Sequence, residues 1–309
     1  MGNVSAWQHP NHRSAAELPV ELRRASVPAR VREWVGRRTG SPVVSVRRLA
    51  GASSTAVHAL RLADGTALVL RRYVWEKFRA EEPEAPAREE EALEYARRQR
   101  LLVPAVIAAD PDGADVGDGI PALLMVRVPG RAQTAPDVRA LAALAAQVHS
   151  VSGTGFGHRY FPWCRDTSTS PPRGCRHPGR WAQALELWRS AEPAYEKCFV
   201  HRDFHPGNVL WSRGTVTGVV DWANACVGPA GIDVATCRWN LHRWAGEKLA
   251  SSFVTAYEEL TSRPHHPYWD LAWVMEHDWD LVDDLVRVWA AEDVLVDIME
   301  RLLDVEGRL

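Results

Sequence analysis

Residues 201–211 read HRDFHPGNVLW, and residues 217–235 read TGVVDWANACVGPAGIDVA. Together they predict a loop, a short strand, a tight turn and an apolar strand that ends at Asp221. Asp203 lies in the loop and Asn208 stands directly before the first strand. An Asp and an Asn five residues apart are commonly turn-forming residues and mean little alone. The full series of loop, strand, turn, strand and terminal Asp is specific, so this stretch decides both fold and function.

The pattern H-x-D-x-x-x-x-N, followed by an apolar strand ending in Asp, resembles the protein-kinase-like superfamily, and within it the aminoglycoside phosphotransferase and choline kinase branch. The resemblance covers roughly residues 45–260 and is strongest over 200–235. It implies an α+β, two-lobed protein-kinase-like fold. Residues 1–128 are then a β-rich, nucleotide-binding N-terminal lobe, and residues 129–309 a mainly helical lobe for catalysis and acceptor binding. It further implies that His201 packs the loop and that Asp233 accepts hydrogen bonds from the loop's backbone.

The residue types fit phosphoryl transfer on chemical grounds as well. This reaction leaves the protein little covalent work, so positioning and charge neutralisation dominate. We assign Asp203 as the catalytic carboxylate that orients the acceptor hydroxyl and takes its proton. Asn208 and Asp221 are assigned to Mg²⁺, which prefers hard oxygen ligands, because two strand ends joined by a hairpin lie close together. The alternative is that these residues merely form turns and cap a strand. The role of Arg202 stays open, and His205 either orients Asp203 or is structural.

Hydrophobic patterning predicts the elements around this stretch. Strands are expected over residues 43–49, 55–62, 66–72, 103–109 and 122–128, with a hairpin turn at Asp64-Gly65. Helices are expected over residues 29–38, 81–98, 136–150 and 181–190, and over most of 232–303, with His265-His266 at the start of one helix. Residues 151–180 form a long connection rich in Gly, Pro, Ser and Thr.

The first lobe is expected to hold ATP or GTP. Arg71 in the strand Leu68–Arg72 occupies the position where the family has a phosphate-contacting lysine, and Arg72 is its rival because strand neighbours face opposite ways. Arginine can grip phosphate through two N–H groups, but it is not equivalent to lysine. Glu89 resembles the helix glutamate that pairs with this cation; the alternative is a solvated charge run.

Two further segments are candidates for nucleotide contacts. In LAGASSTAVHAL, residues 49–60, Gly51 permits close backbone approach and Ser53 and Ser54 can donate to phosphate oxygens. The segment MVRVPG resembles the connector between lobes, where backbone groups from Val126 to Val128 would meet the purine base.

Composition excludes several classes. The 309 residues are 46% hydrophobic and 25% charged, with a net charge of −2, which argues against a nucleic-acid partner. No run approaches the ~20 apolar residues of a membrane span, and no signal-peptide core is visible near the N-terminus. Five scattered cysteines fit reduced thiols in a cytoplasmic protein. The oligomeric state is not readable.

Charge is distributed unevenly. Residues 1–100 hold 18 basic and 12 acidic side chains, whereas residues 267–309 hold 3 basic and 12 acidic ones. The acidic group includes Glu276, Asp278, Asp280, Asp283 and Asp284. Such a surface would attract a cationic acceptor such as an aminoglycoside; the alternative is a solvated helix face.

The resemblance, together with these residues, implies a small-molecule kinase that transfers the γ-phosphate of ATP or GTP to a hydroxyl of an antibiotic. A metabolic kinase of the choline or homoserine type is one alternative. A catalytically inactive kinase-like binding protein is the other, and the arginine at position 71 is its main support.

Overall fold

The structure of the protein is a computed structural model that describes residues 20–23, 25–52, 54–162, 171–276, 285–305 and 307. It divides into two compact units, and each is treated by itself. The first comprises the described residues up to Gln133 together with Gly207–Ala225, and the second comprises Thr134–Pro206 and the described residues from Cys226 onward. The lobe boundary at residues 128–129 remains a prediction. Sheet-rich and helix-rich units confirm the expected α+β class.

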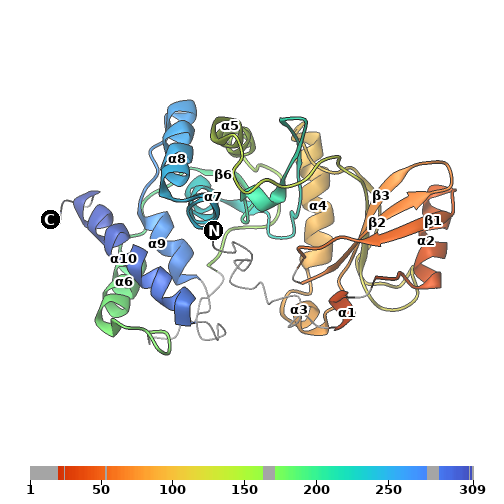
Figure 1. The fold of residues 1–309 in the computed structure, drawn as a ribbon, viewed down its shortest axis with the longest axis horizontal. Coiled ribbons are helices and arrows are strands. Elements are labelled where there is room, and N and C mark those ends of the chain that lie inside the picture. The colour runs from red at the N-terminus through yellow and green to blue at the C-terminus, as the bar shows by residue number, and fades with distance from the viewer. Residues whose placement is uncertain are drawn as a thin grey trace, which may run out of the picture. The chain divides into compact units, whose positions relative to one another are not determined.

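The first unit is built on a five-stranded antiparallel sheet of order β1-β2-β3-β5-β4 (Figure 1). Its strands are β1 (Val43–Arg48), β2 (Ala56–Leu62), β3 (Ala67–Arg72), β4 (Val106–Asp110) and β5 (Ala122–Val126). All five were expected from the sequence. The β2–β3 turn forms as predicted, because Gly65 takes a φ of 88° and the Asp64 carboxylate accepts from the Thr66 amide at 2.8 Å.

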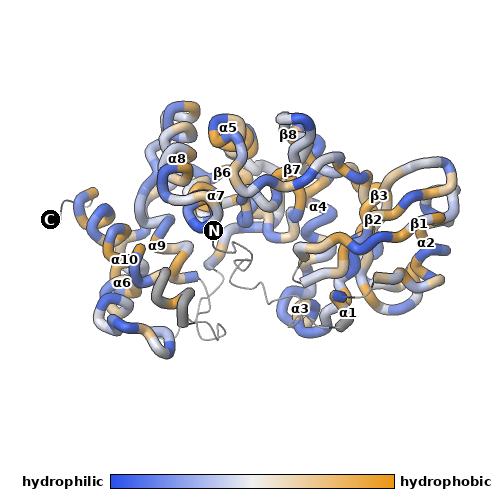
Figure 2. The backbone as a smooth tube through the Cα atoms, viewed as in Figure 1, coloured by the Kyte–Doolittle hydropathy of each residue, from blue (hydrophilic) through white to orange (hydrophobic). Residues whose placement is uncertain are grey.

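In the described residues of this unit, four helices accompany the sheet: α1 (Val20–Arg23), α2 (Ala29–Thr39), α3 (Glu76–Glu81) and α4 (Ala85–Arg98). The prediction of a single helix over residues 81–98 is wrong at its start. Pro83 disfavours helical backbone in the residue before it, so α3 ends at Glu81 and α4 begins afresh with Pro86 in its first turn. Figure 2 shows α3 as largely hydrophilic, and none of its residues is buried.

The two strands predicted between Asn208 and Asp221 form a hairpin of β7 (Val209–Ser212) and β8 (Thr215–Val219) that belongs to the first unit. The Val219 amide donates to the Leu102 carbonyl at 2.7 Å, which fastens the hairpin to the segment after α4. At Gly130 a side chain is excluded, because a Cβ there would lie 2.4 Å from the Trp211 carbonyl oxygen. The hairpin is thus held against two segments of its own unit.

The second unit is mainly helical. Its elements are α5 (Val138–His149), α6 (Pro178–Ser190), β6 (Lys197–Val200), β9 (Cys226–Pro229), α7 (Ala230–Ala245), α8 (Glu247–Thr261), α9 (Tyr268–Met275) and α10 (Leu285–Val305). Strand β9, which pairs antiparallel with β6, was not expected from the sequence. The helix expected to start at His265-His266 begins at Tyr268 instead.

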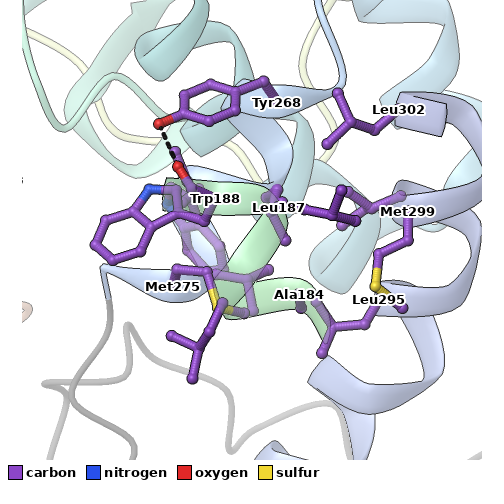
Figure 3. Close-up of a cluster of buried hydrophobic side chains, with 14 of the residues drawn as sticks. Ala184, Leu187, Trp188, Tyr268, Met275, Leu295, Met299 and Leu302 are labelled. Atoms are coloured by element: carbon purple, nitrogen blue, oxygen red, sulfur yellow. Dashed lines mark hydrogen bonds between the residues drawn. The ribbon is translucent and has the colours of Figure 1, made fainter. Parts of the chain in front are cut away.

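Helices α6, α9 and α10 share a hydrophobic core. Figure 3 shows Trp188 and Leu187 of α6 beside Met275 of α9 and Met299 of α10. The Tyr268 hydroxyl donates to the Trp188 carbonyl at 3.1 Å, so its buried polar group is satisfied. Trp181, Trp188, Trp269 and Trp273 are buried in this core. No helix in the described ranges is long and apolar enough to span a membrane.

Candidate active site

The loop that carries Asp203 is fixed through its backbone to the start of α7. The amides of His201 and Arg202 donate to the two carboxylate oxygens of Asp233, each at 2.7 Å. Asp233 lies in the first turn of α7 and is fully buried. Two charge-assisted hydrogen bonds to a buried carboxylate are strong anchors. This confirms the expectation that Asp233 accepts hydrogen bonds from the loop.

A second buried partner of Asp233 was missed from the sequence. His149, the last residue of α5, places Nε2 3.1 Å from Asp233 Oδ2 and Nδ1 2.8 Å from the Tyr257 hydroxyl. All three side chains are almost inaccessible to solvent. A series of side-chain contacts from Tyr257 of α8 through His149 of α5 therefore holds Asp233 of α7, which in turn binds the loop. No local pattern reveals it, because the partners lie 84 and 108 residues from His149.

Asp203 itself presents a carboxylate whose side chain is 15% exposed. Its backbone amide donates to His201 Nδ1 at 3.3 Å. Nε2 of His205 lies 3.7 Å from Asp203 Oδ1, a charge contact when the imidazole is protonated but longer than a hydrogen bond. The His205 ring also meets the Trp244 ring edge to face, with centroids 5.5 Å apart. His205 thus has both an electrostatic and a packing contact.

In the first unit, Arg71 is the cation that faces Glu89. Its Nη1 lies 2.9 Å from Glu89 Oε2 and 2.6 Å from Asp221 Oδ1. The Tyr73 hydroxyl also donates to Glu89. Arg71, Glu89 and Tyr73 are all buried, while the Asp221 side chain is 37% exposed. One guanidinium therefore joins β3, α4 and the end of the β7–β8 hairpin.

The electrostatics of this cluster follow from its burial. Burial raises the pKa of Glu89 above its usual range, although Arg71 opposes the shift. For Arg71, burial by itself would lower the pKa, but Asp221 and Glu89 outweigh it and hold the pKa well above the ordinary value. Burial, reinforced by Glu89, likewise raises the pKa of Tyr73 well above 10.0. The site keeps a permanent cation beside the exposed Asp221 carboxylate.

Arg72 points elsewhere. Its Nη2 lies 2.8 and 2.9 Å from the carboxylate oxygens of Asp118 and 3.2 Å from the Ile120 carbonyl. The alternation of side chains along β3 separates the two arginines, as expected. Arg72 fastens the turn-rich segment before β5 to the sheet, so the rival cation is engaged in a structural contact.

The hairpin brings Asn208 and Asp221 together. Val209 pairs with Val219, and the Val220 amide donates to the Asn208 carbonyl at 2.9 Å, one residue before Asp221. Asp221 has a φ of 70°, a left-handed conformation that is uncommon outside glycine and is found at functional sites. Arg88, which the sequence reading did not single out, donates to the Ala223 carbonyl at 2.5 Å and fixes the chain just beyond.

These residues fit Mg²⁺ by the chemistry of their donors. Asn208 offers an amide oxygen and Asp221 a carboxylate, and Mg²⁺ bound to a nucleotide commonly takes one or two protein oxygens and completes its shell with phosphates and water. The described part of the chain contains no group of three or more His, Cys, Asp or Glu side chains arranged to hold a metal by themselves.

The other expected nucleotide contacts are partly described. Ser53 lies outside the described residues. Ser54 is half-buried, and Gly51 has a φ of 108° with open space where a side chain would be. The Val126 amide already donates to the Ala105 carbonyl at 2.8 Å, so a base at this segment would use other backbone groups. Val128 packs beside Gly218, where a Cβ would come 3.0 Å from Val128 Cγ1.

The acids counted toward a cation-attracting surface are largely paired in the described ranges. Glu276 is buried against Arg202, and Asp270 is buried against Arg238. Glu292 is buried and contacts Arg176 at 3.0 Å. Four other acids of the proposed surface, Asp278, Asp280, Asp283 and Asp284, lie outside the described residues.

Comparisons with known proteins bear on the fold and the family of the chain. No curated protein sequence matches the chain. Among solved structures, aminoglycoside phosphotransferase APH(4)-Ia is 18% identical, with a TM-score of 0.64 over 87% of this chain and 98% of that one. An aminoglycoside-3'-phosphotransferase of type VIII is 21% identical, with a TM-score of 0.58 over 80% of this chain and 96% of that one.

Macrolide 2'-phosphotransferase MphH from Brachybacterium faecium is 18% identical, with a TM-score of 0.52 over 88% of this chain and 91% of that one. These likenesses show the kinase-like fold. The sequence model of the phosphotransferase enzyme family, APH, matches residues 45–277, which hold all of the sheet except the first two residues of β1, together with Arg71, Glu89, the loop that carries Asp203, and Asp221. The chain therefore belongs to the phosphotransferase enzyme family.

Proposed function

We propose that this phosphotransferase moves the γ-phosphate of ATP or GTP, in a magnesium-dependent reaction, to a hydroxyl group of a small-molecule antibiotic. The observation that carries the proposal is the Asn208–Asp221 hairpin, which ends beside the cation Arg71. Support for a nucleotide donor and an antibiotic acceptor comes from a related structure, a thermostable mutant of APH(4)-Ia in ternary complex with AMP-PNP and hygromycin B, which is 19% identical to this chain.

Asp203 is the residue we assign to the acceptor. Its carboxylate would accept a hydrogen bond from the attacking hydroxyl and take its proton as the phosphoryl group moves. The buried Asp233 holds the adjoining backbone from two amides, so the Asp203 carboxylate is presented from a fixed loop. Fixing this group in advance lowers the entropic cost of reaching the transition state.

Arg71, Glu89, Asn208 and Asp221 are assigned to the donor. Arg71 would contact the phosphates through the N–H groups that do not bind Glu89 or Asp221. Glu89 would orient the guanidinium. Bound Mg²⁺ would be held by Asn208 and Asp221 and would neutralise charge on the phosphates. Ser53, Ser54 and the backbone from Val126 to Val128 complete the proposed nucleotide contacts.

The acceptor is proposed to be cationic, of the aminoglycoside type. Because Glu276, Asp270 and Glu292 are engaged in buried pairs, this part of the proposal depends on Asp278, Asp280, Asp283 and Asp284. If the acceptor is cationic, its affinity should fall as ionic strength rises. Charge reversal at Asp280 or Asp284 should weaken it further.

We also propose a cytoplasmic location. Of the described cysteines, Cys198, Cys226 and Cys237 are buried and Cys175 is half-buried. Burial raises the pKa of Cys198 to about 12, so its thiol stays protonated at neutral pH. Buried cysteines of this kind fit a protein kept in a reducing compartment.

The proposal is tested by incubating the purified chain with MgATP or MgGTP and a panel of aminoglycosides, macrolides, choline and homoserine. Nucleoside diphosphate release and the mass of each acceptor are measured. We expect one antibiotic class to gain a phosphoryl group. Phosphorylation of choline or homoserine alone would favour the metabolic alternative, and no Mg²⁺-dependent turnover with any nucleotide would favour the inactive binding protein.

A further inference from the structure

Arg202 stands between His201 and Asp203 and has an unusual conformation. Its φ of 70° lies in the left-handed region, which is uncommon for a long side chain. The residue is only 3% exposed, so a permanent cation is buried next to the proposed catalytic aspartate. Removing such a charge from water is costly, and the cost is offset only when the charge is paired and hydrogen-bonded. The structure must therefore supply partners for it.

The described partners of the guanidinium include a carboxylate, a carbonyl and an aromatic ring. Arg202 Nη2 donates to a carboxylate oxygen of Glu276 and, at 3.2 Å, to the Phe161 carbonyl. The Tyr160 ring covers the cation, with its centroid 4.6 Å from the guanidinium carbon. The Tyr160 hydroxyl donates to the other Glu276 oxygen at 2.5 Å. The Glu276 carboxylate thus bridges Arg202 and Tyr160, with one oxygen bound to each.

Both partners are placed by well-packed elements. Glu276 caps the C-terminus of α9, and its amide donates to the Ala272 carbonyl at 2.9 Å. Tyr160 donates its amide to the Val227 carbonyl of β9 at 3.0 Å, and a Cβ at Gly228 would lie 2.5 Å from Tyr160 Cβ. The network therefore ties the catalytic loop to β9 and α9.

We propose that Glu276 and Tyr160 are positioning residues that hold the Asp203 loop through the side chain of Arg202. Asp233 binds the backbone amides of the loop, and Glu276 binds the Arg202 side chain of the same loop. The loop is thereby fixed by an internal ion pair. The functional consequence rests on the proposed role of Asp203.

The test compares two buried glutamates of the same unit. Glu276→Gln removes the charge opposite Arg202 while nearly keeping the shape of the side chain. Glu292→Gln likewise removes the charge of a fully buried carboxylate. This carboxylate accepts hydrogen bonds from the Arg176 guanidinium, from the His177 amide at 2.8 Å and from the Trp181 indole at 3.1 Å, and none of these donors lies in the catalytic loop. Both variants are expected to lower thermal stability.

Hydrogen exchange of the full-length chain, read on a peptide that covers residues 200–206, separates the two variants. We expect exchange there to speed up at least tenfold in Glu276→Gln and to match the wild type in Glu292→Gln. MgATP hydrolysis, with water as the acceptor, should fall about 10²-fold in Glu276→Gln alone, without a change in the KM for ATP, because a small displacement of a catalytic group has effects of that size.

Equal exchange in the two variants would overturn the proposal. Faster exchange with unchanged hydrolysis would support the contact between Glu276 and the loop but would count against the catalytic role of Asp203. If Glu276→Gln does not fold, the pair Arg202→Met with Glu276→Leu removes both charges together and restores an apolar interior. We expect this double variant to fold, with loop exchange and hydrolysis still impaired. Full recovery of both would show that the pair only balances charge.

Discussion

Replacing Arg71 with methionine tests whether one guanidinium serves both Glu89 and Asp221. Methionine keeps most of the buried side-chain volume but leaves the carboxylate of Glu89, which is 1% exposed, without its cation. Breaking a buried pair in this way typically costs about 3–5 kcal/mol. The Asp221 partner adds little, roughly 0–1 kcal/mol, because its side chain is 37% exposed and screened by water. We expect a loss of about 3–5 kcal/mol in the free energy of unfolding.

A double-mutant cycle separates the ion pair from other effects of the substitution. Arg71→Met and Glu89→Gln touch the same interaction, so their effects should fall short of additive by about 0.5–3 kcal/mol. Arg72→Met is the matched control, because Arg72 is equally buried but pairs with Asp118 at 2.8 Å. Its effect should add to that of Glu89→Gln within about 0.5 kcal/mol.

Urea denaturation followed by far-UV circular dichroism provides the free energies, and titration with ATP in the presence of Mg²⁺ provides nucleotide affinity. Arg71→Met should weaken nucleotide binding, and Arg71→Lys should retain part of it, since a lysine restores the charge but not the second N–H contact. The reasoning is refuted if the coupling appears between Arg72 and Glu89 instead, or if Arg71→Met leaves both stability and nucleotide affinity unchanged.

Three other predictions concern the metal, the buried charges and the helix packing. Asp221→Ala should weaken Mg²⁺-dependent nucleotide binding in calorimetric titrations and leave metal-free binding nearly unchanged; equal affinities with and without Mg²⁺ in the wild type would contradict the assignment. The pKa of Asp270 lies well below 3.8, since His265, Arg238 and Arg301 outweigh the effect of burial. Its charge therefore stabilises the fold above pH 3.8, so the stability gap between wild type and Asp270→Asn should shrink as the pH falls below that value; the same gap at pH 5 and pH 3 would argue against the linkage. Gly231→Ala should lower the free energy of unfolding by about 1–3 kcal/mol, because its Cβ would lie 2.1 Å from Trp269 Cδ1, and an unchanged melting temperature would mean that α7 and α9 are less tightly packed than described.

Much of the fold was predictable because local patterns carry it. The alternating strands of the sheet, the Asp64-Gly65 turn and the hairpin after Asn208 were all expected and are all present. The errors lie where short segments depend on tertiary partners. Strand β9 has four residues, including a Gly and a Pro, and forms because β6 pairs with it. The break between α3 and α4 reflects the backbone restriction at Pro83.

Less of the site could be read from the sequence. Alternation along β3 predicts that Arg71 and Arg72 point to opposite faces, but it does not predict which of them contacts Glu89. Both side chains are buried and each has an acidic partner, Glu89 for Arg71 and Asp118 for Arg72. Glu276 was counted as a surface acid, yet it is buried against Arg202, which is 74 residues away. Interactions between residues so distant in sequence leave no local periodicity, and they are settled only by the packing of α9.

The central claim is that Asp203 serves phosphoryl transfer from a magnesium-bound nucleotide to a hydroxylated antibiotic. The most direct measurement follows the transfer of labelled γ-phosphate from ATP and GTP to an antibiotic panel, comparing wild type, Asp203→Asn and the exposed control Glu259→Gln, with Mg²⁺ and with EDTA. We predict labelled antibiotic with wild type and Glu259→Gln only when Mg²⁺ is present. Asp203→Asn should bind nucleotide normally and transfer label about 10²–10⁴-fold more slowly. Transfer at the wild-type rate by Asp203→Asn, or no transfer to any antibiotic by the wild type, would contradict the claim.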